Sequence, residues 1–206
     1  MCAFDESKYL DRFKNHVATL TDYNNIKILD FKKPDSNEYR IRFLFEEDYC
    51  RLHITGDIGD LIACNYNNMC FDKFGDFVNN TGYFEEKVDC HSKPFHYYDE
   101  DLAREQVIKY IEEHISLYEF DSYDEFYSDE ENLENILNEI FENFTEENGI
   151  DSQGLDMVAK TNGLDSYTVY EWLHDAGKKD TDILELYMLA FKLAMEQLKE
   201  KTYEIS

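Results

Sequence analysis

The side chains with the most chemistry to offer are the carboxylates of residues 110–159, a stretch of fifty residues without Lys or Arg. Sixteen of these residues are Asp or Glu, and Tyr and Phe residues are interleaved among them. Ionised carboxylates accept charge-assisted hydrogen bonds from Lys and Arg, and they repel phosphates. The stretch therefore predicts a surface that binds cationic groups on another protein.

Residues 128–147 form the densest part of this stretch and are predicted to be one helix. Apolar residues recur at i, i+3, i+4, i+7, i+8 and i+11 and make one stripe: Leu133, Ile136, Leu137, Ile140, Phe141 and Phe144. Ser128 and Glu131 have the spacing of a capping box. Eight carboxylates fall off the stripe, and over roughly 28 Å of helix they give about one charge per 3.5 Å. A DNA strand presents a phosphate about every 3.4 Å, so the spacing resembles that of a phosphate backbone.

The candidate partner-binding residues are the acids of this helix and of the acidic-aromatic connector before it. Exposed tyrosines among them would add contact area to an interface. The set is Asp121, Tyr123, Asp124, Glu125, Tyr127, Asp129, Glu130, Glu131, Glu134 and Glu142.

Patterns that would indicate a metal site or a phosphate loop are incomplete in this chain. Cys64, Cys70, Cys90 and His91 could be drawn as a zinc site, but no C-x-x-C pair is present. Gly56-Asp57-Ile58-Gly59 could let a backbone approach a phosphate, although a hairpin turn that needs positive φ is favoured. Asp151-Ser152-Gln153-Gly154 lacks the acids of a calcium loop. We predict no metal and no cofactor.

A catalytic centre is not indicated either. His114 has no catalytic partner near it in the sequence, and no Ser-His-Asp, Cys-His or P-loop signature is present. A metal-dependent nuclease needs acids that converge on one point, whereas these acids share one face of a helix. We therefore predict that the protein is not an enzyme.

The composition indicates a folded chain with an uneven charge. Hydrophobic residues make up 43% of the 206 residues, which is enough for a core. Residues 1–98 hold 17 acids and 12 bases, and residues 99–206 hold 29 acids and eight bases. We expect a sheet domain at 1–98 and an acidic helical domain at 99–206, with one continuous globular unit as the alternative.

The five cysteines, Cys2, Cys50, Cys64, Cys70 and Cys90, are odd in number and irregularly spaced. No signal peptide pattern precedes them, and no apolar run reaches transmembrane length. We expect free thiols, a cytoplasmic protein and no membrane partner.

The predicted elements make an α+β fold. A helix is expected at 5–20, and strands at 26–31, 39–45, 49–55 and 60–66 form a small antiparallel meander over 26–66. Short helices follow within 71–88, and everything after residue 100 is expected to be helical, at 100–118, 128–147, 155–161, 167–176 and 180–201. Trp172, the only tryptophan, is expected in the core.

Three separated stretches resemble a group of small acidic accessory proteins encoded by bacteriophages and prophages, many of them in Gram-positive hosts. The stretches are Leu52-His53-Ile54-Thr55-Gly56-Asp57-Ile58-Gly59, Gly82-Tyr83-Phe84-Glu85-Glu86-Lys87 and Leu189-Ala190-Phe191-Lys192-Leu193-Ala194. The resemblance implies an accessory phage gene product without known chemistry. Such proteins include anti-CRISPR and anti-restriction inhibitors, several of which act as DNA mimics.

The leading hypothesis is a non-enzymatic inhibitor of a host defence nuclease, in particular a CRISPR effector. Its acidic surface would occupy a positively charged nucleic-acid channel, with no direct contact to nucleic acid. One alternative is a defence inhibitor that blocks its target without mimicry, and another is an acidic protein–protein adaptor.

Overall fold

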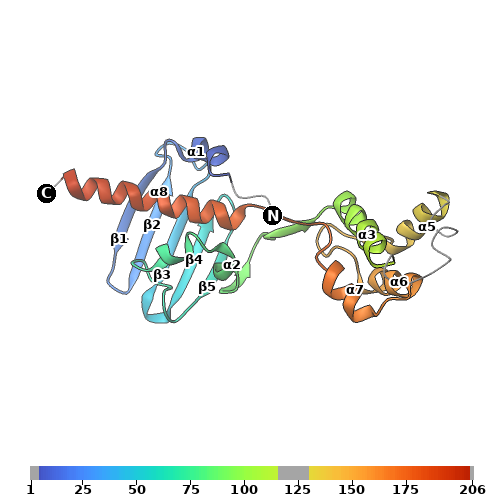
Figure 1. Ribbon diagram of the computed structural model, residues 1–206. Helices are drawn as coiled ribbons and strands as arrows, with labels where there is room; N and C mark the ends of the chain where they lie inside the picture. The colour runs from blue at the N-terminus through green and yellow to red at the C-terminus, as the bar shows by residue number, and fades with distance from the viewer. Residues whose placement is uncertain (1–4, 116–129, 205–206) are drawn as a thin grey trace. The chain divides into compact units, whose positions relative to one another are not determined.

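The computed structural model describes residues 5–115 and 130–204, and the chain folds into two compact units (Figure 1). The sheet unit comprises Met1–Phe95 and Asp182–Ser206, and the helical unit comprises His96–Thr181. The sequence placed a single boundary at 98/99 and gave the last helix to the helical part. That helix instead joins the sheet unit, because its apolar side chains complete the core beneath the sheet.

The sheet has six antiparallel strands whose spatial order equals their order in the chain. This confirms the α+β fold and the meander predicted between residues 26 and 66. Two further strands, one at each edge, extend the predicted set. The strands are β1 Val17–Asp22, β2 Ile26–Lys32, β3 Ile41–Glu46, β4 Arg51–Gly56, β5 Leu61–Cys64 and β6 Val88–His91.

The helix predicted over residues 5–20 is wrong in its second half. The helix α1 covers only Ser7–Phe13, and the following residues form β1, which pairs with β2 from Val17↔Lys32 to Asp22↔Lys27. The alternation of β-branched residues in Val-Ala-Thr-Leu-Thr favours a strand, and it competes with the helical spacing of the apolar residues. Leu10 and Val17 are exposed, so the apolar spacing over residues 5–20 does not mark one buried face.

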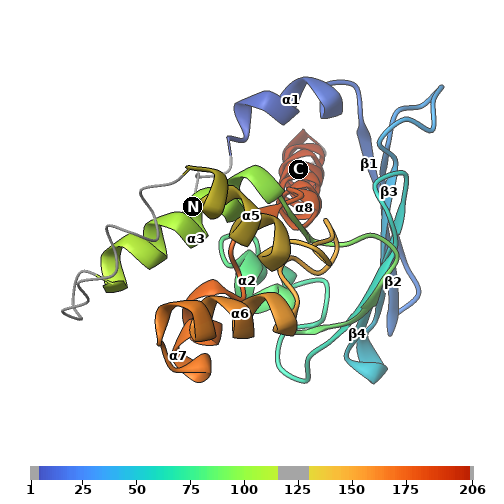
Figure 2. The same ribbon diagram turned by 90° about the vertical axis from the view of Figure 1, so that its right-hand side faces the viewer.

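One face of the sheet carries the core of the sheet unit. The helices α1, α2 (Thr81–Glu85) and α8 (Ile183–Glu204) lie on this side, which Figure 2 shows with the sheet seen along its edge. The 3-10 helix η2 (Phe74–Phe77) also packs against α8. Four phenylalanine rings surround Phe191 of α8. The centroid of the Phe191 ring lies 4.8 Å from that of Phe74, 5.5 Å from that of Phe43, and 6.3 Å from those of Phe45 and Phe71.

Side chains of α8 also cover the free edge of β1. The Ala18 amide donates to Oε1 of Gln197 at 2.9 Å, and Lys201 Nζ donates to the Ala18 carbonyl at 3.0 Å. An unpaired edge offers backbone groups to other strands, and covering it limits edge-to-edge association. Thus α8 both supplies core and closes one edge of the sheet.

His16 is buried in this core, 2% exposed, between the rings of Phe13 and Phe31. Its Nε2 lies 3.1 Å from the carbonyl oxygen of Tyr39, so we place the proton on Nε2. Its Nδ1 is buried and has no hydrogen-bond partner in the described part of the chain. Burial lowers the pKa of His16 below its usual value of 6.5, because a charged imidazolium loses its hydration there.

This burial predicts a loss of stability in mild acid. Below pH 6.5, the pKa of His16 in the unfolded chain, the unfolded chain binds a proton at His16 while the folded chain does not. The free energy of unfolding therefore falls as the pH drops below that point. The slope reaches at most about 1.4 kcal/mol per pH unit for one group. Urea unfolding between about pH 7.5 and about pH 5.5 measures it. A His16→Gln variant should show a shallower slope, and an unchanged slope would contradict the assignment.

The helical unit is built on a short antiparallel ribbon, β7 His96–Tyr98 and β8 Lys178–Asp180, through which the chain enters and leaves. Between these strands lie α3 Glu100–Ile115, α5 Glu130–Ile140, α6 Ser152–Asn162 and α7 Ser166–Leu173. Asp151 and Asp165 cap α6 and α7 by accepting from the Gly154 and Thr168 amides. The described C-terminal region is mostly helical, as predicted, with β8 and an isolated bridge between Thr145 and Gly149 as exceptions.

The core of the helical unit is separate from that of the sheet unit. Its buried residues are Ala103, Val107, Tyr110, Ile111, Leu137, Ile140, Phe141, Ile150, Leu155, Val158, Ala159, Val169, Leu173 and Ala176. They come from α3, α5, α6 and α7 and from described turns next to these helices. The apolar stripe predicted around Leu137, Ile140 and Phe141 therefore faces inward.

Candidate partner-binding surface

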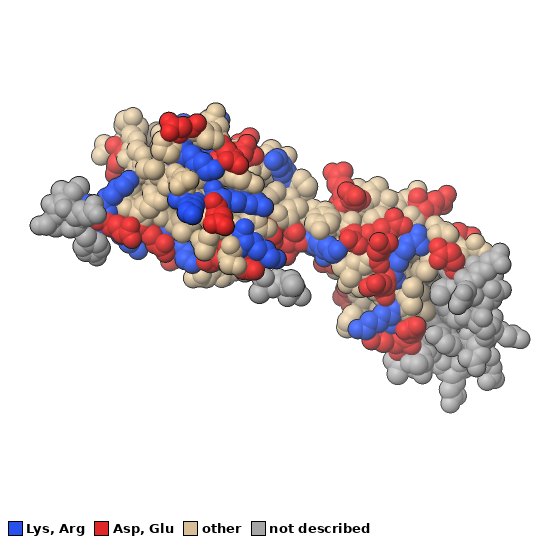
Figure 3. All heavy atoms as spheres, turned by 90° about the horizontal axis from the view of Figure 1, so that it is seen from above, with Lys and Arg blue, Asp and Glu red and all other residues tan. Residues whose placement is uncertain are grey.

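The negative charge of the chain is concentrated in the helical unit. Residues 96–181 hold 24 acids and five bases, a formal charge of −19, whereas the sheet unit holds 22 acids and 15 bases, a charge of −7. On the face drawn in Figure 3, Lys and Arg lie among the acids of the sheet unit, and Asp and Glu prevail over the helical unit. Fifteen of the described carboxylates in the helical unit are exposed.

The few bases of the helical unit are mostly neutralised within it. Arg104 lies 2.8 Å from Glu100 and Lys109 lies 3.7 Å from Glu113, both one helical turn apart on α3. Lys178 lies 3.1 Å from Asp175, and Lys179 lies 2.6 Å from Asp99. The Lys179 ammonium is the main reason that the pKa of Asp99 is lowered. The remaining exposed acids form a field of one sign.

The structure describes only part of the predicted binding set. Glu134 and Glu142 are exposed, as a binding role requires. Glu130 and Glu131 lie in the first turn of α5, and nothing is described of their side chains. The other six lie outside the described residues: Asp121, Tyr123, Asp124, Glu125, Tyr127 and Asp129. The predicted capping residue Ser128 lies outside them as well.

The predicted continuous helix to residue 147 is wrong, because α5 ends at Ile140. Its 11 residues span roughly 16 Å rather than 28 Å. The chain then turns so that the Gly149 amide donates to the Thr145 carbonyl at 2.8 Å. The backbone at Gly154 of α6 packs against the Ile140 carbonyl so closely that a Cβ atom would collide with it. Glu142, Glu146 and Glu147 therefore lie on turns, so a straight row of charges at DNA-like spacing does not extend beyond α5.

Three aromatic side chains of α7 are exposed, which the sequence did not predict. Tyr167 is 69% exposed, Tyr170 54% and Trp172 65%, although Trp172 was expected in the core. The buried residues of α7 are Val169 and Leu173, which are four apart and face the core. Trp172 lies three residues after Val169, at the flank of this buried stripe, and its side chain is exposed there. Helical spacing alone does not predict this exposure.

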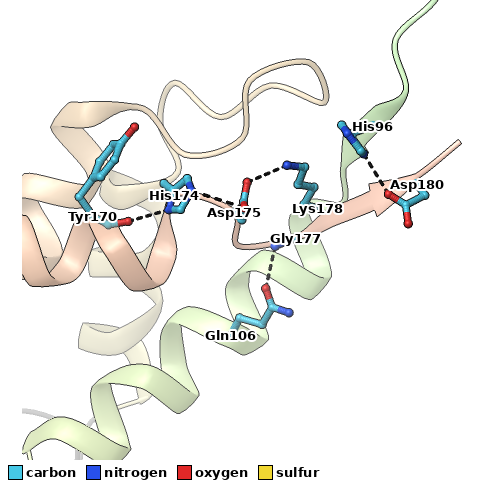
Figure 4. Close-up of polar contacts among 8 residues, drawn as sticks. All are labelled: His96, Gln106, Tyr170, His174, Asp175, Gly177, Lys178 and Asp180. Carbon is cyan, nitrogen blue, oxygen red and sulfur yellow. Dashed lines mark hydrogen bonds and ion pairs between the residues drawn. The ribbon is translucent and has the colours of Figure 1, made fainter. Parts of the chain in front are cut away.

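Polar contacts join the turn after α7 to α3 and link the two strands of the β7–β8 ribbon (Figure 4). The Gly177 amide donates to Oε1 of Gln106 at 2.7 Å, which ties the turn after α7 to α3. His96 Nδ1 lies 2.9 Å from Asp180 across the ribbon. His174 stacks on Tyr170, with its Nδ1 2.9 Å from the Tyr170 carbonyl and its Nε2 3.4 Å from Asp175. Because these groups hold one another, we interpret them as a support for α7 and the ribbon.

The structure describes the glycine pair and the cysteines that could indicate a phosphate loop or a zinc site in the sequence. Gly56 and Gly59 form the predicted turn between β4 and β5, with φ of 159° and 150°. Among the described residues, Cys50, Cys64, Cys70 and Cys90 are free thiols, and no group of three or more His, Cys, Asp or Glu side chains is placed to hold a metal ion. Nothing is described of the His114 side chain. No described helix is long and apolar enough to cross a membrane.

Comparisons with protein-family models, with curated proteins and with solved structures find no match to this chain. The resemblance to phage accessory proteins therefore stays a prediction. We infer the function from the charge and the exposed groups of the described surface.

Proposed function

We propose that this protein is a non-enzymatic cytoplasmic inhibitor that occupies the positively charged nucleic-acid channel of a defence nuclease. The target class, a CRISPR effector, follows from the resemblance noted in the sequence. The helical unit supplies the binding surface. The protein itself contacts no nucleic acid, because the acids of the helical unit repel a phosphate backbone.

The observation that carries this proposal is the charge of the helical unit. A formal charge of −19 on residues 96–181, with four of five bases paired internally, leaves a large excess of carboxylates. Maintaining such an excess costs stability through repulsion, so it favours a role in binding. Channels that hold nucleic acid present Lys and Arg, which pair with carboxylates as they pair with phosphates.

Mimicry here requires a distributed field rather than a straight row of charges. The exposed acids of the described surface come from α3, α5, α6, α7 and the segments between and after them, for example Glu105, Glu139 and Glu171. A field of this kind steers a basic partner at long range and speeds association. It also makes binding sensitive to salt, because the Debye length is about 8 Å at physiological ionic strength.

A competition experiment tests the proposal. A guide-loaded Cas9-type nuclease is mixed with a labelled target duplex and increasing amounts of the protein, and duplex binding is followed by anisotropy. We expect the protein to displace the duplex and the displacement to weaken steeply with added salt. The same titration with other guide-loaded effectors defines the target range. Simultaneous binding of duplex and protein, or no binding across the panel, would exclude channel mimicry.

The exposed aromatic side chains of α7 favour a second candidate, an adaptor or inhibitor that blocks its target by contact without mimicry. Tyr and Trp are enriched in binding hot spots, and Tyr167, Tyr170 and Trp172 lie exposed on one short helix. Binding anchored by such residues depends on apolar contact and persists at about 1 M salt, where the Debye length is about 3 Å. Salt-resistant binding to a basic partner would therefore favour this candidate.

A further inference from the structure

An unexplained positive site lies on the sheet unit, where β2 ends and β3 begins. A hollow of about 340 Å³ opens there on the outer face of the sheet. Its lining residues are Asp30, Lys32, Arg40, Ile41, Arg42, Thr55, Gly56 and Asp60. Three cations and two carboxylates thus surround it, in a protein whose net charge is −26.

The carboxylates of this hollow are already engaged. Asp30 accepts two hydrogen bonds from Arg42, from Nε at 2.7 Å and from Nη2 at 3.0 Å, in a forked geometry. Asp60 accepts from the Gly56 amide at 3.3 Å. A guanidinium has five N–H donors, so Arg42 keeps donors beyond those that Asp30 uses.

The other two cations of the hollow, Lys32 and Arg40, lie opposite each other. Phe31 pairs with Ile41 in the sheet, so the next residues, Lys32 and Arg40, face each other across the strand ends. Both are exposed, and in the part of the chain that the structure describes neither has an acidic side chain within ion-pair distance. The neighbouring Lys33, by contrast, pairs with Glu38 at 2.6 Å. Like charges that face each other across strands destabilise a sheet, and an anion between them would remove the repulsion.

We propose that this hollow binds the phosphate group of a small polar molecule. Lys32 and Arg40 hold the phosphate from either side, and the remaining donors of Arg42 and the Thr55 hydroxyl complete its hydrogen bonds. A volume of about 340 Å³ accommodates a phosphate with a small polar group attached. None of the described residues that line the hollow is aromatic, so they offer no platform for stacking a nucleobase. The site is independent of the helical unit and of its proposed function.

Gly56 allows two backbone segments to approach each other closely at this hollow. It has φ of 159°, and a Cβ atom there would collide with the Arg40 carbonyl oxygen. The backbones of β4 and of the residue before β3 therefore approach closely, with the Asp57 amide donating to that same carbonyl at 3.0 Å. This contact fixes the Arg40 backbone, and through it the position from which the guanidinium extends.

The test is a titration of the full-length protein with inorganic phosphate, with ribose 5-phosphate and with malonate, each against chloride at equal ionic strength. Amide chemical shifts report binding, and we expect saturable shifts at Thr55 and Gly56 with a phosphate ligand. Lys32→Gln and Arg40→Gln should each weaken binding at least tenfold. Lys8→Gln, which removes an exposed cation of the same unit away from the hollow, should change it less than twofold.

The three titrations distinguish the possible ligands. Tighter binding of ribose 5-phosphate than of phosphate indicates a phosphate ester, and the reverse indicates free phosphate; both support the proposal. Binding of malonate in the absence of phosphate binding would contradict the proposed phosphate site. Amide chemical-shift changes that chloride reproduces would contradict it as well. Equal affinity in Lys32→Gln, Arg40→Gln and the wild type would also overturn it. Circular dichroism of each variant confirms that the fold is retained.

Discussion

Reversing the charge of Glu134, Glu139 and Glu142 to Lys is expected to weaken binding to the target nuclease about a hundredfold. An exposed ion pair contributes about 0.5 kcal/mol, and a cation facing another cation costs a similar amount. Three lost pairs and three new repulsions therefore amount to about 3 kcal/mol. The fold should persist, because all three side chains are exposed while the neighbouring Leu137, Ile140 and Phe141 are buried.

The matched control reverses three exposed acids of the sheet unit, Asp89, Glu196 and Glu200, and changes the net charge by the same amount. If the helical unit is the binding surface, this control should bind the nuclease nearly as well as the wild type. Equal losses in both variants would show that only total charge matters. Normal binding of the helical-unit variant would contradict the proposed surface.

Replacing Phe191 by Ala is expected to have the largest effect on stability. Phe191 is 2% exposed, and its ring contacts four other phenylalanine rings contributed by β3, η2 and the segment before η2. Truncating a buried Phe typically costs about 3–5 kcal/mol, because the cavity collapses only in part. Domains have only about 5–15 kcal/mol of stability, so the sheet unit should be close to unfolding.

Urea unfolding followed by circular dichroism measures this loss. Phe191→Leu should recover much of the stability, because it leaves a smaller cavity. Tyr66→Ala removes an aromatic side chain that is 88% exposed, and it should shift the unfolding free energy by less than about 0.5 kcal/mol. A Phe191→Ala variant as stable as Tyr66→Ala would mean that α8 does not contribute to the core as described.

Within α5, the exposure of Glu134 and the burial of its apolar stripe followed from helical periodicity. The positions of Glu134 and of the buried Leu137 and Ile140 agree with the predicted stripe. The length of the helix did not follow, since α5 ends where Gly154 of another helix meets the Ile140 carbonyl. The exposure of Trp172 was not predicted, because a position three residues after the buried Val169 is also compatible with a place in the core.

Local rules let the sequence determine the strands of the meander and several helix ends. In β3, Arg42 faces outward and Phe43 inward because successive side chains alternate. Asp151 and Asp165 start helices because each side chain accepts from an amide three residues on. Such features involve neighbours within a few residues, so a single sequence suffices to find them.

Only the tertiary structure decided the features that depend on residues far apart in the chain. The residues of β1 form a strand because β2 pairs with them and α8 covers their edge, with Gln197 bonded to Ala18 across 179 positions. The opposed Lys32 and Arg40 arise from the register of two strands, which no spacing along the chain reveals. The last helix, α8, belongs to the sheet unit because its apolar face packs against the phenylalanine rings there. In each case the stabilising contact is made with residues far away in the chain, so local sequence patterns do not predict it.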